Sequence, residues 1–133
     1  MIEALSAMGS VFTDPYLLGL IFATTVLGVI IGVLPGLGAT TGAALLLPFT
    51  LTMEPVQAIA VLSTIYVSAT FAGSITAILI NTPGTSAAAA TTFDGYPLAQ
   101  KGEAGRALGM ATVSSTVGAV SYTHLTLPTN REV

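Results

Sequence analysis

The sequence predicts an all-α integral membrane protein in which transmembrane helices are joined by re-entrant segments broken by proline and glycine. Hydrophobic residues make up 53% of the chain and charged residues only 7%, whereas about a quarter of the residues of a soluble domain are charged. Glu54 is the only formal charge between Pro15 and Phe93. A stretch this apolar is long enough for several membrane crossings, because each crossing needs roughly 20 apolar residues.

Two uninterrupted apolar segments, residues 16–34 and 56–80, are predicted to span the membrane as helices. Asp14 and Pro15 suit the N-cap and the first helical position of the first segment. Such helices pack closely where small residues share one face, so we expect a helix bundle. Small residues recur every four positions: Gly28, Gly32 and Gly36 in and just after the first segment, then Ala69, Gly73 and Ala77 in the second.

Two further segments have compositions that prevent an ordinary helix interior. Residues 35–52 begin PGLGATTG, and residues 81–92 read NTPGTSAAAATT. Glycine and proline both disfavour a continuous helix. The apolar run at 42–52 is too short to span a membrane alone and is typical of a re-entrant element. We expect Pro48 to interrupt it a second time.

These paired interruptions indicate a binding site for a solute or an ion. A helix broken at membrane depth frees backbone groups, which are tolerated only inside protein or beside a water-filled cavity. Half-helix N-termini favour anions, whereas exposed carbonyl groups coordinate cations. The alternative is that each Pro-Gly pair is only a kink or an interfacial loop. The candidate substrate- or ion-binding residues are Pro35, Gly36, Gly38, Thr40, Thr41, Asn81, Thr82, Pro83, Gly84, Thr85, Ser86 and Asp94.

Two polar residues outside the broken segments have competing interpretations. Asp94 is either a membrane-proximal carboxylate that couples to a proton or cation or, as we favour, the start of a DGYP turn at 94–97. Tyr66 is interpreted as a helix-packing residue. The loop at 98–106 carries two basic residues, so the positive-inside bias places it in the cytoplasm.

Several other classes of function are disfavoured by composition. The chain has no cysteine, which excludes disulfides and thiolate metal sites. It has no basic patch, so nucleic acid is not an expected partner. PGLG lacks the lysine of a nucleotide-binding P-loop. No catalytic constellation is present, and we therefore expect neither an enzyme nor a cofactor or metal site.

Two long motifs support a specific family resemblance. GVLPGLGATTGAALLLPFT at 32–50 and GSITAILINTPGTSAAAATTFDGYPLAQKGEAGRALGMA at 73–111 closely resemble the large membrane subunit of tripartite tricarboxylate transporters, with similarity over residues 17–119. The resemblance implies a multi-pass permease of the bacterial inner membrane. It would take up carboxylates such as citrate, driven by an H⁺ or Na⁺ gradient, with a small membrane subunit and a periplasmic solute-binding protein as partners. The matching motif positions are Pro35, Gly36, Gly38, Gly42, Asn81, Pro83, Gly84, Asp94, Gly95, Tyr96 and Pro97.

On this resemblance, residues 16–120 form a partial permease domain. Residues 1–15 are either a frayed lead-in or an interfacial helix. Residues 121–133 read SYTHLTLPTNREV and resemble a translated sequencing adaptor, so we predict a non-native tail that cuts off a third membrane helix begun at Ala107. A genuine polar tail is the alternative. The alternative functions are a non-transporting membrane scaffold and a channel-like helical subunit.

Overall fold

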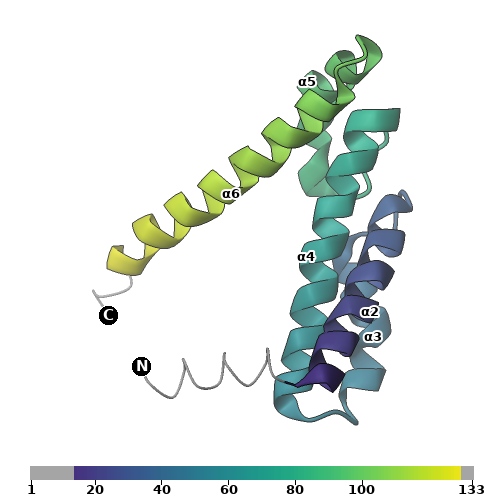
Figure 1. Cartoon of the computed structure of the whole chain (residues 1–133), viewed down its shortest axis with the longest axis vertical. Helices are drawn as coiled ribbons and strands as arrows, with labels where there is room; N and C mark the ends of the chain where they lie inside the picture. The colour runs from purple at the N-terminus through teal and green to yellow at the C-terminus, as the bar shows by residue number, and fades with distance from the viewer. Residues whose placement is uncertain (1–13, 130–133) are drawn as a thin grey trace.

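A computed structural model describes residues 14–129, and all regular structure within that range is helical (Figure 1). The long helices α2 and α4 coincide with the two predicted apolar helices and are apolar and long enough to cross a membrane. The interpretation of residues 1–15 falls almost wholly outside the described range. The elements are α2 (Pro15–Val33), α3 (Ala39–Thr50), α4 (Pro55–Ile80), the short 3₁₀ helix η1 (Ser86–Ala88), α5 (Ala89–Gln100) and α6 (Ala104–Thr129).

Helix α2 begins where the sequence predicts. The Asp14 carboxylate accepts hydrogen bonds from the backbone N–H groups of Tyr16 (2.9 Å) and Leu17 (3.5 Å), and Pro15 occupies the first turn. Inside the helix, the Thr24 and Thr25 hydroxyls donate to backbone carbonyls one turn earlier. These bonds satisfy the polar groups within the helix itself, so α2 can present an otherwise apolar surface.

The core of the bundle is the contact between α2 and α4, with α3 packed beside them (Figure 1). A Cβ added to Gly28 would collide with the Ser68 hydroxyl, and one added to Gly32 would collide with the backbone of Ala69. These two glycines therefore let the helix backbones approach closely, as the small-residue stripe predicts. The other predicted stripe also faces inward, since Ala69, Gly73 and Ala77 of α4 are all buried.

Gly36 does not belong to the glycine stripe of α2, contrary to expectation. It lies beyond the helix end with φ +90°, in a turn closed by the bond from the Leu37 N–H to the Leu34 carbonyl (3.2 Å). Proline at the second position and glycine with positive φ at the third are typical of a type II turn. Pro35-Gly36 therefore ends α2 and turns the chain back into α3.

Helix α3 has 12 residues and is about 18 Å long at 1.5 Å per residue. This length is short of the roughly 30 Å of a bilayer core, as the sequence indicates. The expectation that Pro48 interrupts the segment is wrong, because the helix continues through Pro48 to Thr50. Pro48 has no N–H to donate to the Ala44 carbonyl, so the helix continues through it with one intrahelical hydrogen bond fewer.

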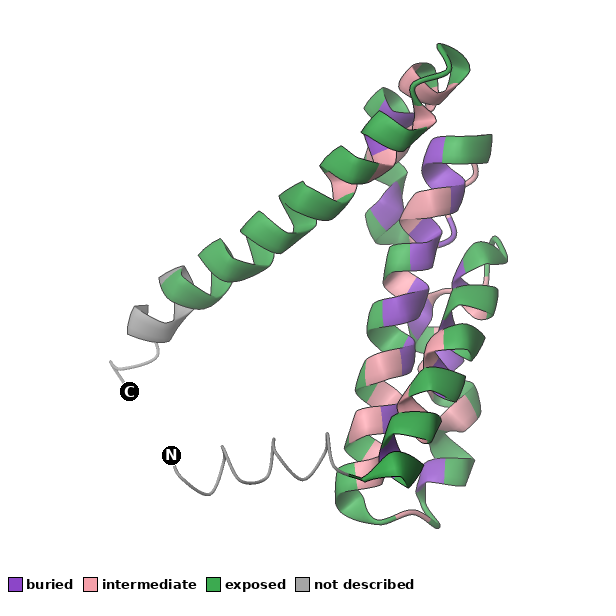
Figure 2. Cartoon of the chain, viewed as in Figure 1, coloured by how far each residue is buried: buried purple, intermediate pink, exposed green. Residues whose placement is uncertain are grey.

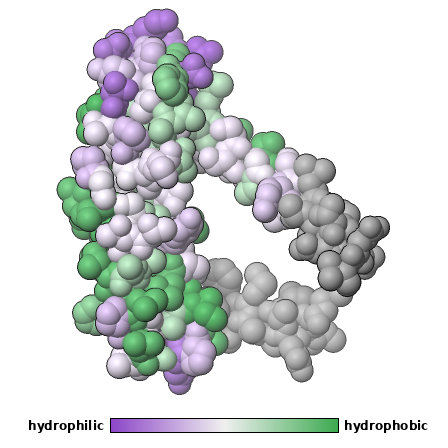
Figure 3. All heavy atoms as spheres, turned by 180° about the vertical axis from the view of Figure 1, so that it is seen from behind, coloured by the Kyte–Doolittle hydropathy of each residue, from purple (hydrophilic) through white to green (hydrophobic). Residues whose placement is uncertain are grey.

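The outer surface of the bundle is strongly apolar. Figure 2 shows the buried residues of α4 on the side that faces α2 and α3, while the opposite sides are exposed. Large exposed side chains include Phe22 (73%), Ile59 (69%) and Phe49 (64%). In Figure 3, hydrophilic residues gather at the end of the molecule that carries the α5–α6 connection. An extended apolar surface of this kind suits contact with lipid.

The predicted turn at Asp94–Pro97 is wrong, because these residues lie inside α5. Gly95 is buried there, and a Cβ on it would lie 2.7 Å from Cγ1 of Ile78. The glycine thus serves a close helix contact rather than a turn. The chain reverses later, at 101–103, where Gly102 has φ +81° and Arg106 forms an ion pair with Glu103 (3.0 Å).

Helix α6 runs without a break from Ala104 to Thr129, so the change of composition at Ser121 does not end the helix as expected. It diverges from α4 along most of its length (Figure 1), and Ala107 is its one buried residue among those with described side chains. Unlike α2 and α4, α6 does not have the apolarity of a membrane span. Its assignment as a third membrane helix with a non-native end stays a prediction.

Candidate functional site

The segment after α4 folds back along that helix. Asn81 ends α4 in the left-handed conformation (φ 56°), and its N–H bonds to the Thr76 carbonyl. The chain then runs back along α4, and the Gly84 N–H donates a hydrogen bond to the Gly73 carbonyl (3.4 Å). Gly73 lies seven residues before Ile80, which corresponds to about 10 Å of helix. From this point η1 and α5 run back toward the end of α4, so residues 81–100 form a hairpin.

Three glycines from different parts of the chain meet at the tip of this hairpin. A Cβ added to Gly84 would collide with the carbonyl oxygen of Gly32 and lie 2.9 Å from Cα of Gly73. Gly84 therefore fits here only because it has no side chain. The contact fixes the second Pro-Gly loop against the end of α2, beside the turn that contains the first.

A cavity of about 350 Å³ lies where the two Pro-Gly segments meet. The sequence predicts both segments as halves of a site, and the fold brings them together from α2–α3 on one side and α4–α5 on the other. The predicted residues that line the cavity are Gly36, Gly38, Thr40, Pro83, Gly84, Thr85 and Ser86. Ala39, Tyr66, Thr70 and Ala87 complete the lining.

The cavity collects hydrogen-bonding groups but no charged side chain. Gly38 caps α3 without a side-chain hydrogen bond, so the N–H groups of the first turn of α3 remain available. Thr85 caps η1 and likewise makes no side-chain hydrogen bond to the first turn of that helix. Both helix starts carry partial positive charge, and five hydroxyls line the same space. They belong to Thr40, Tyr66, Thr70, Thr85 and Ser86.

Thr85 is the most distinctive of these hydroxyl residues. Its Oγ1 is buried and has no hydrogen-bond partner among the described residues, while its N and Cγ2 pack where a Cβ of Gly73 would stand (3.0 Å each). A buried hydroxyl without a partner is costly. Because Oγ1 also packs toward Gly73, 3.1 Å from where a Cβ on that residue would stand, a shift of the loop is needed to bring this hydroxyl to a polar group in the cavity.

The remaining predicted site residues do not line this cavity. Pro35 shapes the turn before α3, and Thr41 lies in the first turn of α3. Asn81 caps α4, and the Thr82 hydroxyl donates to the Ile80 carbonyl (3.0 Å). Asp94 lines a second cavity between α4, α5 and α6.

Two residues that line the cavity, Tyr66 and Thr70, are not among the site residues predicted from the sequence. Tyr66, interpreted as a packing residue, is half-exposed (50%) and lines the cavity together with Thr70. The two residues are four apart and thus share one face of α4. That spacing predicts that the two side chains lie together, but it does not show which face of α4 meets the Pro-Gly segments.

Asn81 gives a prediction about the loop rather than about direct binding. Because φ is +56°, a β-branched residue is strained at this position and glycine is not. We expect Asn81→Val to lower the free energy of unfolding by about 1–2 kcal/mol, and Asn81→Gly to be nearly neutral. Denaturation of the reconstituted protein by SDS measures both. Equal stability of the two variants would contradict the proposed capping role.

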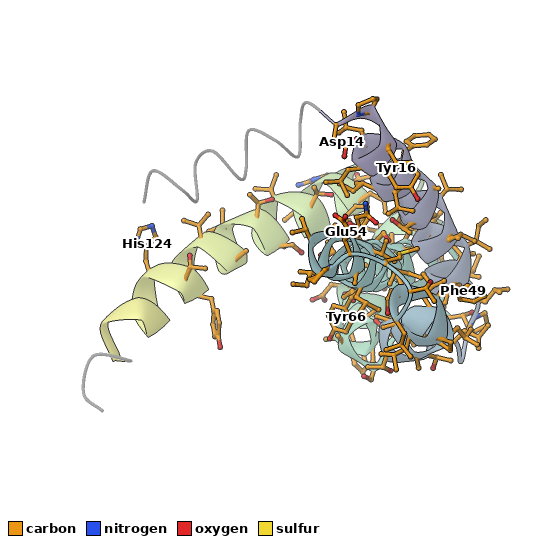
Figure 4. All side chains as sticks on the ribbon, turned by 90° about the horizontal axis from the view of Figure 1, so that it is seen from below. Asp14, Tyr16, Phe49, Glu54, Tyr66 and His124 are labelled. Atoms are coloured by element: carbon orange, nitrogen blue, oxygen red, sulfur yellow. The ribbon has the colours of Figure 1, made fainter. Side chains whose placement is uncertain are left out.

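The described residues contain no arrangement suited to acid–base or metal chemistry near the cavity. Within residues 14–129 no group of three His, Cys, Asp or Glu side chains is placed to hold a metal ion. His124, the chain's only histidine, lies far along α6 and away from the helix bundle (Figures 1 and 4). The lining of the cavity offers backbone N–H groups and hydroxyls rather than charged side chains.

Comparison with known proteins agrees with this architecture. A model of the "Tripartite tricarboxylate transporter TctA family" matches residues 18–129. A curated relative from Agrobacterium vitis, described as an uncharacterized 52.8 kDa protein in the TAR-I ttuC' 3' region, is 51% identical over 94 residues. That match covers 71% of this chain and 19% of the relative. No solved structure shows significant similarity. The chain belongs to the tripartite tricarboxylate transporter TctA family.

Proposed function

We propose that this chain forms part of a membrane permease subunit and supplies a binding cavity for a carboxylate solute. The observation that carries the proposal is the meeting of two Pro-Gly segments, each followed by a helix start, at one cavity of about 350 Å³. Family membership supports the same conclusion, because the family consists of transporter components.

A carboxylate fits the chemistry of this cavity. The free N–H groups at the start of α3 and the hydroxyls of Thr40, Thr85 and Ser86 can donate hydrogen bonds to carboxylate oxygens. Helix N-termini favour an anion without a fixed positive side chain. Binding through dipoles alone is weaker than an ion pair with Arg or Lys, which suits a transporter that must release its solute.

The complete transporter is a larger assembly than this chain. We propose a multi-pass subunit in the bacterial inner membrane that works with a small membrane subunit and a periplasmic binding protein, using an H⁺ or Na⁺ gradient. With the Lys101–Glu103 connection in the cytoplasm, the cavity would lie about 10 Å from the cytoplasmic end of α4. Because the chain spans 19% of the curated relative's length, these properties belong to the proposal for the whole permease.

The hydroxyl groups provide the test. In a full-length permease that carries this segment and is co-expressed with its partners, Thr85→Val keeps the packing against Gly73 but removes the buried hydroxyl. We expect the apparent affinity for the carboxylate to fall by about tenfold, since a hydrogen bond to a charged group contributes roughly 1.5–3 kcal/mol. Uptake of radiolabelled citrate and related carboxylates measures the effect, and Thr40→Val should act in the same direction.

Thr112→Val is the matched control, because the Thr112 hydroxyl is exposed and bonds within α6 to the Leu108 carbonyl (2.9 Å). Unchanged uptake in both cavity variants would reject the cavity as the solute site. Absence of uptake in the unmodified assembly would favour a scaffold. Solute flux without the binding protein or an ion gradient would favour a channel.

A further inference from the structure

A third cavity, of about 270 Å³, lies between α4 and α6 and is called the α4–α6 cavity below. Tyr66 and Thr70 line it, and the same two residues line the cavity proposed for the solute. The two cavities therefore adjoin across these two side chains. The other residues that line the α4–α6 cavity are Val67, Phe71, Ser74 and Ser115.

The hydroxyls that α4 contributes to this cavity lie well inside the helix. Tyr66, Thr70 and Ser74 are spaced four residues apart and thus share one face of α4. Tyr66 lies 14 residues and Ser74 six residues before Ile80, the last residue of α4. These separations correspond to about 21 Å and about 9 Å of helix. When α4 spans a bilayer, lipid at this depth offers no hydrogen-bond partner.

Three of the four hydroxyls in the α4–α6 cavity are unpaired. The Thr70 hydroxyl donates to the Tyr66 carbonyl one turn earlier (2.7 Å), and the Ser68 hydroxyl on the same helix does likewise to the carbonyl four residues before it. By contrast, the hydroxyls of Tyr66, Ser74 and Ser115 form no hydrogen bond with any described residue. An unpaired hydroxyl is costly in an apolar environment, so these groups call for water or another polar molecule in the cavity.

We propose that the α4–α6 cavity is a water-filled compartment of the transport path and that Tyr66 gates the passage between it and the solute cavity. Tyr66 is half-exposed, and no hydrogen bond with a described residue holds its phenol in place. Its side chain can therefore change rotamer without movement of the α4 backbone. The role in transport rests on the proposed function, whereas the presence of water does not.

The presence of water can be measured without transport. A full-length permease that carries this segment, and from which cysteines elsewhere have been removed, receives Ser74→Cys or Ser115→Cys. In lipid vesicles, a charged methanethiosulfonate reagent is applied to both sides of the membrane. Both cysteines are expected to react at a rate comparable to that of Lys101→Cys, which lies exposed in the α5–α6 connection.

Phe22→Cys is the control for a position that faces apolar surroundings. Phe22 is exposed on α2 and lines neither cavity. This cysteine is expected to react at least about tenfold more slowly, because the reactive thiolate is disfavoured in apolar surroundings. If Ser74→Cys or Ser115→Cys reacts as slowly as Phe22→Cys, lipid or a packed helix fills the cavity and the proposal is overturned.

The gate is tested by removing the ring of Tyr66. Proteoliposomes loaded with radiolabelled citrate are placed in buffer without an ion gradient or a binding protein. Tyr66→Ala is expected to increase citrate efflux several-fold, whereas Tyr66→Phe keeps the ring and should not. Tyr16→Ala is the matched control, because Tyr16 is similarly exposed but lies at the start of α2.

The gate is overturned if efflux from Tyr66→Ala is unchanged, or if Tyr66→Phe or Tyr16→Ala releases citrate as fast as Tyr66→Ala. Thr40→Val and Thr85→Val are expected to lower carboxylate uptake without changing the reaction of Ser74→Cys. Failure of the solute site and failure of the water-filled compartment can thus be distinguished.

Discussion

Gly84→Leu is expected to abolish carboxylate uptake while the permease still inserts into the membrane. A side chain at this position would collide with the carbonyl of Gly32 and crowd Cα of Gly73. These are backbone atoms, so the strain cannot be relieved by rotating a neighbouring side chain. The Pro83–Ser86 loop must move out of its place, and the cavity then loses one wall.

Uptake assays and protease accessibility of the inserted protein measure the two parts of this prediction separately. Gly109→Leu is the matched control, because nothing lies within 4 Å of a Cβ added to Gly109 on α6. Normal uptake by Gly84→Leu would show that the Pro-Gly loop does not form the solute site.

Gly32→Leu is expected to destabilise the contact between α2 and α4. Its new side chain would enter the backbone of Ala69, where the carbonyl oxygen and Cα are the nearest atoms. Overpacking of this kind costs about 1–3 kcal/mol, and more when backbone must move, so we expect a loss of about 3 kcal/mol. The free energy of unfolding in SDS measures it.

Gly19→Leu lies on the same helix at a position with open space around it. This control should change stability by less than about 0.5 kcal/mol, as exposed substitutions usually do. If both leucine variants were equally stable, the close approach of α2 and α4 at Gly32 would be contradicted.

The spanning helices and the positions of the breaks follow from local properties of the sequence. Apolar length predicts α2 and α4, and Asp14-Pro15 marks the start of α2 because an N-cap depends on neighbouring residues alone. Pro35-Gly36 and Asn81 end their helices for equally local reasons. Such features carry their own signal and need no knowledge of tertiary structure.

The wrong predictions concern residues whose backbone conformation depends on tertiary structure. DGYP at 94–97 has the composition of a turn, but the contact between Gly95 and Ile78 holds it in a helix. Gly36 matches the spacing of a helix stripe and yet lies in a turn with positive φ. Composition alone does not distinguish a glycine used for close packing from one used for chain reversal.

The candidate site was only half predictable for the same reason. Pro-Gly breaks followed by hydroxyl residues identify both segments, because backbone groups freed at membrane depth need hydrogen-bond partners from protein or from a water-filled cavity. Tyr66 and Thr70 lie on a continuous helix, and only the packing of α4 shows that they face the cavity. That packing depends on the meeting of Gly32, Gly73 and Gly84, which come from three distant parts of the chain.

The central claim is that the two Pro-Gly segments form one solute cavity, and cysteine labelling tests it most directly. This chain has no native cysteine, so Thr40→Cys and Ser86→Cys can be placed singly, one in each segment, in a full-length permease from which any cysteines elsewhere have been removed. The account predicts that a bound carboxylate solute slows modification of both thiols by a small polar reagent, while a cysteine at Thr112 is unaffected. Protection of one cavity position alone, or of neither, would contradict it.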